Sequence, residues 1–344
     1  MIDIVYMVTM TSTTAVSGSG GAAGAPGAAR QPAVSVEEIL SGSRVTFGVT
    51  APASAATVAE LEASGVESLW AGGHIASRNP SPEAMIYLAL LAANSTVPVG
   101  TATLLLPLYP PAIVAKQIAD LDNASDGRLL LGVGVGGEYP QEFRAVQVPM
   151  PERGRRADES IALIRRLWTG EQISHGGPFY PMDEVKVHPR PRQSGGPPIV
   201  VSGRQEAAMR RAALLGDGWM PYLYSPRRYR ASVARIREIA AADGRDLGRF
   251  GWMLYVPVCV DPDAARARRA AAGFLGGTYQ QDFEQMIEHV GAAGPAGYVA
   301  ERLCEYVDAG VRHFIFLMVG DPVAQARQLA ERVVPVLREQ AARA

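Results

Sequence analysis

From Val97 to Tyr139 the chain reads VPVGTATLLLPLYPPAIVAKQIADLDNASDGRLLLGVGVGGEY. Two apolar or glycine-rich runs, residues 97–106 and 128–135, flank the segment Pro111–Ala124, which carries a proline at its first position. The runs predict strands, and the proline predicts the start of a helix between them. A strand, a helix and a second strand in this order form the unit from which parallel sheets are built.

The same alternation continues along the chain. Strands are predicted at residues 44–49, 68–73, 97–106, 128–135, 197–203, 218–221, 251–260 and 313–319. Helices are predicted at 55–64, 82–94, 111–124, 152–168, 205–215, 226–242, 264–275, 282–290, 295–309 and 322–338. Such an α/β chain forms either a closed (β/α)₈ TIM barrel or an open, doubly wound sheet. The count of eight strands favours the barrel, with insertions after strands four and seven.

The composition agrees with a large globular enzyme domain. The chain has 344 residues, 48% of them hydrophobic and 19% charged, and a formal net charge of −1. This balance gives no indication of a nucleic-acid or membrane-surface partner. No apolar run reaches the roughly 18 residues of a membrane span, and no basic signal region is visible, so a cytoplasmic location is expected. The two cysteines and five histidines lack metal-ligand spacing, so no metal site is expected.

Residues 1–43 differ from the rest of the chain. The run SGSGGAAGAPG at 17–27 is of low complexity. It cannot bury enough apolar surface to offset the entropy lost on ordering. We therefore expect residues 1–43 to be a disordered or loosely attached arm, and residues 44–344 to be the barrel.

Candidate functional residues follow the predicted strands, because barrel enzymes place their active sites at the C-terminal strand ends. His74 comes directly after the second strand and is a candidate catalytic residue, or else a structural histidine. His313 begins the last strand and would lie at the opposite end of the barrel. Trp70 and Trp219 are expected to pack between the barrel and its helices.

Two segments have the character of anion sites. Gly136 and Gly137 follow the fourth strand, and glycine lets backbone N–H groups approach an anion closely, although small residues also serve tight packing. Ser202, Gly203 and Arg204 precede a helix, whose N-terminus attracts phosphate. The alternative is that Ser202 is an ordinary N-cap.

Four blocks of the sequence resemble one known family, the bacterial-luciferase-like, flavin-dependent monooxygenases. They are Thr101–Phe143, Glu152–Trp168 (ERGRRADESIALIRRLW), Pro197–Gly203 (PPIVVSG) and Gly216–Pro221 (GDGWMP). The resemblance extends from about Val45 to the C-terminus and implies a TIM barrel that binds FMN or, in some branches, the deazaflavin coenzyme F-420.

The resemblance also implies roles for individual residues. A cis peptide bond at Ala102–Thr103 would lie beneath the flavin ring. His74 occupies the position of the family's catalytic histidine, but Gly73 replaces the acidic residue that often precedes it, so solvent or another residue would have to orient the imidazole. The implied cofactor-binding residues are Ala102, Thr103, Gly136, Gly137, Glu138, Tyr139, Arg153, Ser202, Gly203 and Arg204.

The activity implied is oxidation of a small organic substrate by reduced FMN and oxygen through a C4a-peroxyflavin. A separate flavin reductase is the implied partner, and a homodimer is one possible assembly of the chain. One alternative is hydride transfer by coenzyme F-420. The composition favours it, because only Lys116 and Lys186 are lysines and the other basic residues are arginines. This bias is typical of GC-rich bacterial genomes. A second alternative is a non-catalytic flavin-binding barrel, suggested by Gly73.

Overall fold

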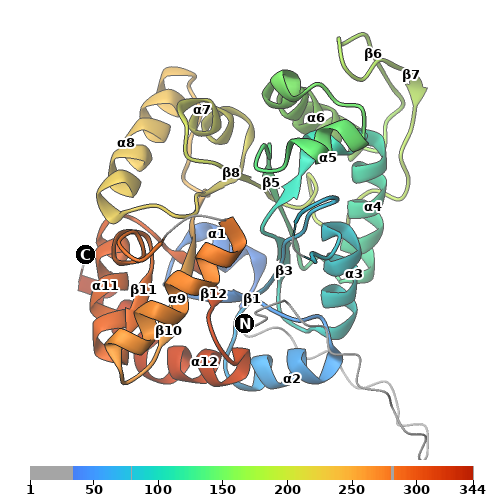
Figure 1. Ribbon diagram of the computed structural model, residues 1–344. Helices are drawn as coiled ribbons and strands as arrows, with labels where there is room; N and C mark the ends of the chain where they lie inside the picture. Colours follow the sequence, from blue (N-terminus) through green and yellow to red (C-terminus); the bar gives the residue numbers. More distant parts are fainter. Residues whose placement is uncertain (1–33, 79, 280–282, 344) are drawn as a thin grey trace, which may run out of the picture.

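Eight parallel strands close into a barrel in the computed structural model, which describes residues 34–78, 80–279 and 283–343 (Figure 1). The last strand pairs with the first, with Thr46 opposite His313 and Val49 opposite Phe316. The predicted (β/α)₈ TIM barrel is therefore confirmed. In order around the barrel, the strands are β1 (Thr46–Thr50), β2 (Leu69–Ala71), β3 (Val99–Thr101), β5 (Leu129–Gly134), β8 (Ile199–Ser202), β9 (Gly218–Met220), β10 (Gly251–Val260) and β12 (His313–Met318).

The third predicted strand, residues 97–106, is interrupted in the structure. β3 ends at Thr101, and the short strand β4 (Leu104–Leu105) then continues beside β5. Between them the Ala102–Thr103 peptide bond is cis, at the position that the family resemblance implies. The interruption places these two residues at the C-terminal rim of the barrel.

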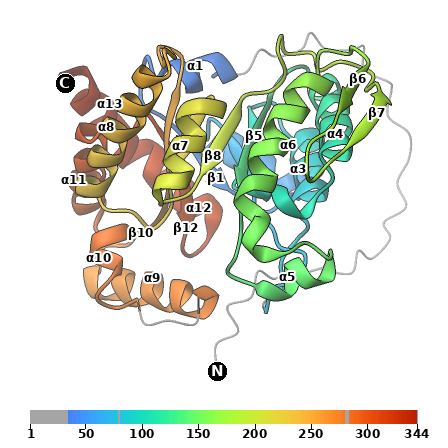
Figure 2. The ribbon, with the colours of Figure 1, turned by 90° about the horizontal axis from the view of Figure 1, so that it is seen from above.

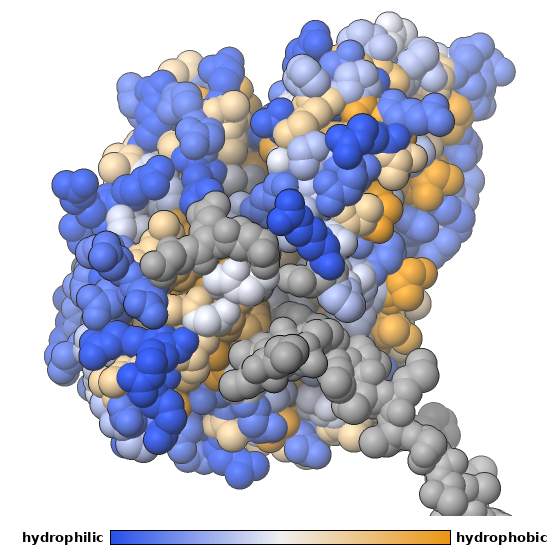
Figure 3. Space-filling model, viewed as in Figure 1, coloured by the Kyte–Doolittle hydropathy of each residue, from blue (hydrophilic) through white to orange (hydrophobic). Residues whose placement is uncertain are grey.

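Amphipathic helices cover the barrel. In α6 (Arg153–Leu167), Ile161, Ile164 and Leu167 are buried on one side, and the outward faces of the helices are mostly hydrophilic (Figure 3). The predicted closing helix is divided into α12 (Pro322–Gln328), a π-helical turn at 329–333 and α13 (Val334–Arg343). No helix among the described residues is long and apolar enough to cross a membrane. The other covering helices are α2 (Ala55–Ala63), α3 (Ala84–Asn94), α4 (Pro111–Ala124), α6 (Arg153–Leu167), α7 (Glu206–Leu215), α8 (Pro226–Ala242) and α11 (Ala296–Asp308).

Two connections contain additional elements. After β5, the chain forms α5 (Pro140–Ala145), α6 and an antiparallel hairpin of β6 (Ile173–His175) and β7 (Met182–Val185). After β10, it forms α9 (Ala264–Tyr279), α10 (Ile287–Val290) and β11 (Ala292–Gly294), which pairs with β10. Figure 2 shows α5 and α9 at the same end of the barrel.

The N-terminal helix α1 (Val36–Ser41) lies at the opposite end (Figure 2). Ser35 caps it reciprocally with Glu38, whose backbone N–H donates to Ser35 Oγ at 3.2 Å. Ile39 is fully buried and belongs to one apolar cluster with Met253 and Ile315 of the strands. The expectation of a loose arm up to residue 43 is therefore wrong for residues 34–43, while residues 1–33 lie outside the described part of the chain.

His313 lies at the N-terminal end of β12, as predicted, and is fully buried. Its two ring nitrogens lie 2.8 Å from Thr46 Oγ1 and 3.1 Å from Ser68 Oγ. Burial lowers its pKa to about 3, so the ring stays neutral. His313 thus joins β12 to β1 and β2 and is a structural residue.

Deletion of α1 should destabilise the barrel. Removal of residues 1–42 exposes the apolar end of the barrel and takes away three buried side chains, each worth about 1.5–3 kcal/mol. We expect Tm to fall by about 5 °C or more. Deletion of residues 1–33 is the control and should leave Tm nearly unchanged. Equal Tm values for the two truncations, measured by calorimetry, would show that α1 contributes no stability.

Candidate active site

A cavity of about 580 Å³ lies at the C-terminal ends of the strands, within the usual size range of small-molecule sites. Its wall combines loops that follow β2, β3, β5, β8 and β9 with part of α9. None of the described residues that line it is a lysine or an arginine. The sequence-predicted residues among its lining are His74, Ala102, Thr103, Gly136, Gly137, Glu138, Tyr139, Ser202 and Gly203.

Arg153 and Arg204 are predicted site residues that do not line the cavity but lie next to residues that do. Arg153 opens α6, and a Cβ built on Gly137 would lie 3.5 Å from its Nε. The Arg204 guanidinium lies over the ring of Tyr222, 4.9 Å from the ring centroid. Arg153 therefore borders the glycine loop, and Arg204 supports an aromatic wall residue. The cofactor-binding roles of all ten residues stay predictions.

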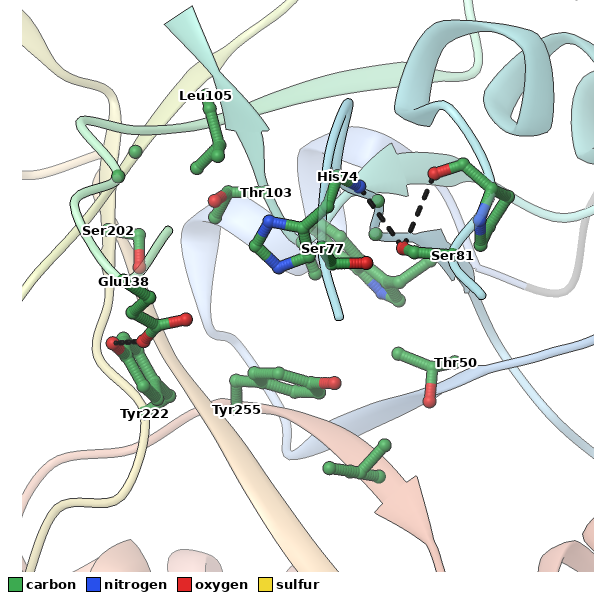
Figure 4. A pocket seen from close by; sticks show the side chains of 18 of the residues that line it. Thr50, His74, Ser77, Ser81, Thr103, Leu105, Glu138, Ser202, Tyr222 and Tyr255 are labelled. Atoms are coloured by element: carbon green, nitrogen blue, oxygen red, sulfur yellow. Dashed lines mark hydrogen bonds between the residues drawn. The ribbon is translucent and has the colours of Figure 1, made fainter. Parts of the chain in front are cut away.

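His74 extends its imidazole into the cavity (Figure 4). Its backbone N–H is held by Ser81 Oγ at 3.1 Å and by the carbonyl oxygen of Pro82 at 3.2 Å. The ring meets Tyr139 edge to face, with 4.9 Å between the centroids. Its Nδ1 lies 3.2 and 3.3 Å from the two carboxylate oxygens of Glu142.

Glu142 is the functional-site residue that the sequence analysis missed. It lies on α5, is fully buried and also accepts a hydrogen bond from the backbone N–H of Ile75 at 2.8 Å. α5 has only six residues, so no helical periodicity could mark the inward position of Glu142. The one sequence signal was the neighbouring Phe143, an apolar residue that predicts burial of this short segment and is indeed buried in the structure.

Gly73 is required by the close approach of another part of the chain. A Cβ at this position would lie 2.1 Å from the carbonyl oxygen of Pro82 and 2.8 Å from the backbone nitrogen of Ala84. No side chain fits there without a shift of the backbone. The acidic residue expected before His74 is therefore excluded, and Glu142 supplies a carboxylate from the other side of the ring.

A second polar pair crosses the cavity wall. The hydroxyl of Tyr222 donates to Glu138 Oε1 at 2.6 Å and joins the loop after β9 to the loop after β5 (Figure 4). Burial, and then the negative charge of Glu138, raise the pKa of Tyr222, so the phenol stays protonated as the donor. The buried Trp219 donates to the carbonyl oxygen of Gly203 at 2.9 Å and fixes the loop after β8.

The loops after β5 and β8 form a cradle suited to an anion. Gly136, Gly137 and Gly203 have φ values of 64°, 127° and 137°, which only glycine adopts readily. α7 begins after Gln205, so Ser202 is not its N-cap. Arg153 Nε is a buried donor without an acceptor among the described residues. A buried, unpaired cationic donor beside a glycine loop fits the phosphate of a flavin nucleotide.

Comparisons with known sequences agree on one family. The family described as luciferase-like monooxygenase matches residues 39–313. The F420-dependent glucose-6-phosphate dehydrogenase of Kineococcus radiotolerans is 30% identical over 337 residues, which cover 88% of this chain and 95% of the relative. The FMNH(2)-dependent dimethylsulfone monooxygenase of Pseudomonas putida is 32% identical over 261 residues, covering 72% of this chain and 68% of the relative.

Other matches are partial or structural. An uncharacterized protein of Mycobacterium tuberculosis is 36% identical over 167 residues, so the match spans 48% of this chain and 57% of that relative. Among solved structures, a monooxygenase from Streptomyces bottropensis has a TM-score of 0.71 at 25% identity. The match covers 84% of this chain and 99% of the monooxygenase. An F420-dependent secondary alcohol dehydrogenase has a TM-score of 0.77 at 20% identity, covering 86% and 99%, and shows the shared fold.

Replacement of Gly73 by alanine should destabilise the site. The added Cβ would overlap the backbone of Pro82, and overpacking of this kind costs about 1–3 kcal/mol. The matched control is Gly176→Ala, because a Cβ at Gly176 meets nothing within 4 Å. Chemical denaturation of both variants measures the difference. A Gly73→Ala protein as stable as the control would contradict the close approach of this loop.

Proposed function

The chain belongs to the family of luciferase-like monooxygenases, and we propose that it is a flavin-dependent oxidoreductase that uses reduced FMN and oxygen to oxidise a small organic substrate. A separate flavin reductase would supply the reduced FMN. The observation that carries the choice of FMN is the distribution of positive charge around the cavity.

Positive charge near the cavity comes from arginines that border its lining, and one of them, the exposed Arg78, lies close enough to Tyr139 for its charge to act on that phenol. The two predicted site arginines, Arg153 and Arg204, lie next to Gly137 and Tyr222 of the lining, and no lysine or arginine occurs among the described lining residues. A single phosphate group, as in FMN, needs only the glycine loop and one or two arginines beside it. The longer anionic tail of coenzyme F-420 would call for further cations at the mouth.

The residues divide the work between binding and proton handling. The backbone N–H groups of Gly136 and Gly137, together with Arg153, would hold the phosphate, and Ala102 and Thr103 would support the ring system. Bound reduced FMN supplies the electrons for oxygen activation. His74, which lines the cavity, is placed to hold or move a proton at its cavity-facing nitrogen.

A second candidate function is hydride transfer with coenzyme F-420. The observation that favours it is the extent of similarity to the Kineococcus radiotolerans relative, which covers 88% of this chain. The same cavity and the same His74 would serve this chemistry without oxygen. Anaerobic turnover with F-420 distinguishes it from the FMN-dependent reaction.

Titration with FMN, riboflavin and F-420, followed by fluorescence, tests the cofactor. Wild-type protein should bind FMN more tightly than F-420. Arg153→Ala should weaken FMN binding roughly ten- to hundredfold, since a charge-assisted hydrogen bond is worth about 1.5–3 kcal/mol, and should change riboflavin binding little. Arg204→Ala is the comparison and tests the other predicted arginine. Equal weakening of both ligands by Arg153→Ala would place Arg153 away from the phosphate.

Replacement of His74 by alanine should separate oxygen uptake from product formation. Reduced-flavin binding should stay within a few-fold of wild type, while substrate oxidation falls by about 10²–10⁴, the usual worth of a general acid or base. Oxygen uptake should continue and release hydrogen peroxide. The measurement is product and peroxide per flavin oxidised in both proteins. An unchanged product yield would return His74 to a structural role, and flavin binding without oxidation in wild type would support the non-catalytic barrel.

A further inference from the structure

Among the described residues, the imidazole of His74 has its hydrogen-bonding partner at Nδ1. Its Nδ1 lies 3.2 and 3.3 Å from the carboxylate oxygens of Glu142, and an ionised carboxylate can only accept hydrogen bonds. Whenever the ring carries a single proton, that proton must therefore lie on Nδ1. The other nitrogen, Nε2, is then left as an acceptor for a proton in the cavity that His74 lines.

We propose that Glu142 is the positioning residue of this active site and holds His74 in the Nδ1–H tautomer with Nε2 available to the reacting groups. The role in turnover rests on the proposed function, but the tautomer does not. Carboxylates behind an imidazole fix its tautomer and orientation in many enzymes and metal sites.

Burial and backbone hydrogen bonds fix the position of the Glu142 carboxylate. It is fully buried, and its Oε1 accepts from the backbone N–H groups of Ile75 at 2.8 Å and Ala76 at 3.5 Å in addition to its contact with His74. These bonds tie the carboxylate to the loop that carries His74. The backbone of Pro82 leaves no space for a side chain at Gly73, so a carboxylate cannot come from that position.

The carboxylate also connects two parts of the site. Glu142 follows Tyr139 by less than one helical turn, and Tyr139 packs edge to face against the His74 ring. The segment from Gly136 to Glu142 thus provides the glycine loop at one end and the support of His74 at the other. A shift of this segment would change the orientation of the imidazole.

The chain contains a matched control for this pair. Glu159 Oε1 lies 3.1 Å from His175 Nε2 and accepts from the backbone N–H groups of Phe179 at 3.3 Å and Tyr180 at 2.9 Å. This pair joins α6 to the β6–β7 hairpin, and neither residue lines the cavity. Glu159→Gln therefore removes a similar interaction from a place without a proposed role in the reaction.

The first test is the tautomer of His74 in Glu142→Gln without any cofactor. The glutamine oxygen should keep the Oε1 position on the N–H groups of Ile75 and Ala76, so that the amide nitrogen takes the place of Oε2, which lies 3.3 Å from Nδ1, and donates to the ring. The ring should then change to the Nε2–H tautomer. Nitrogen-15 NMR of histidine-labelled protein reads the tautomer directly, and His74→Ala assigns the signal. Wild type should show Nδ1–H, and an Nε2–H ring in wild type would overturn the proposal.

The second test compares turnover. Glu142→Gln should lower kcat about ten- to hundredfold with little change in the KM of reduced flavin, the size of effect typical of residues that orient a functional group. Glu159→Gln should leave kcat unchanged at a comparable loss of Tm. Should Glu142→Gln not fold, Glu142→Asp keeps an acceptor-only carboxylate and should retain the Nδ1–H signal.

The outcomes separate the two proposals. An Nδ1–H ring in wild type that changes in Glu142→Gln, in a protein without activity on reduced FMN, would leave the positioning role intact and overturn the proposed function. Equal loss of kcat in Glu142→Gln and Glu159→Gln would reduce Glu142 to a purely structural residue.

Discussion

The pairing of β12 with β1 is the interaction on which the rest of the structure depends. It joins the last strand to the first and turns an open parallel sheet into a barrel without free edges. Because all eight strands run in the same direction, their C-terminal ends meet at one rim. Residues as distant in sequence as His74, Glu142 and Ser202 therefore line or border one cavity.

The sequence predicted those parts of the fold that depend on local pattern. All eight strands follow from apolar runs, and the bounds of β10, Gly251–Val260, match the prediction at both ends. Residues at strand ends, such as His74 and Ser202, could be assigned to the site because the barrel topology places them there. The position of the Ala102–Thr103 cis bond came from the family resemblance, since nothing local in that run marks it.

Features that depend on distant contacts were not predictable from one sequence. α1 lies beside a low-complexity segment, and its burial is decided by strand residues such as Met253 and Ile315. Glu142 resembles any acidic residue of a short helix, and only the folded chain shows that its carboxylate meets His74. Gly73, read alone, suggested a missing carboxylate, whereas the structure shows that the acidic group comes from Glu142 on helix α5.

The position of α1 has a consequence for the order of assembly during synthesis. The helix is translated before every strand of the barrel, but the apolar cluster that contains Ile39 includes Ile315, on the last strand. The neighbouring pair Thr46 and His313 is separated by 267 residues. Closing so long a chain segment costs entropy that local contacts cannot offset early. Docking of α1 therefore depends on β10 and β12, two strands translated long after the helix itself, and it cannot be complete before both have been made.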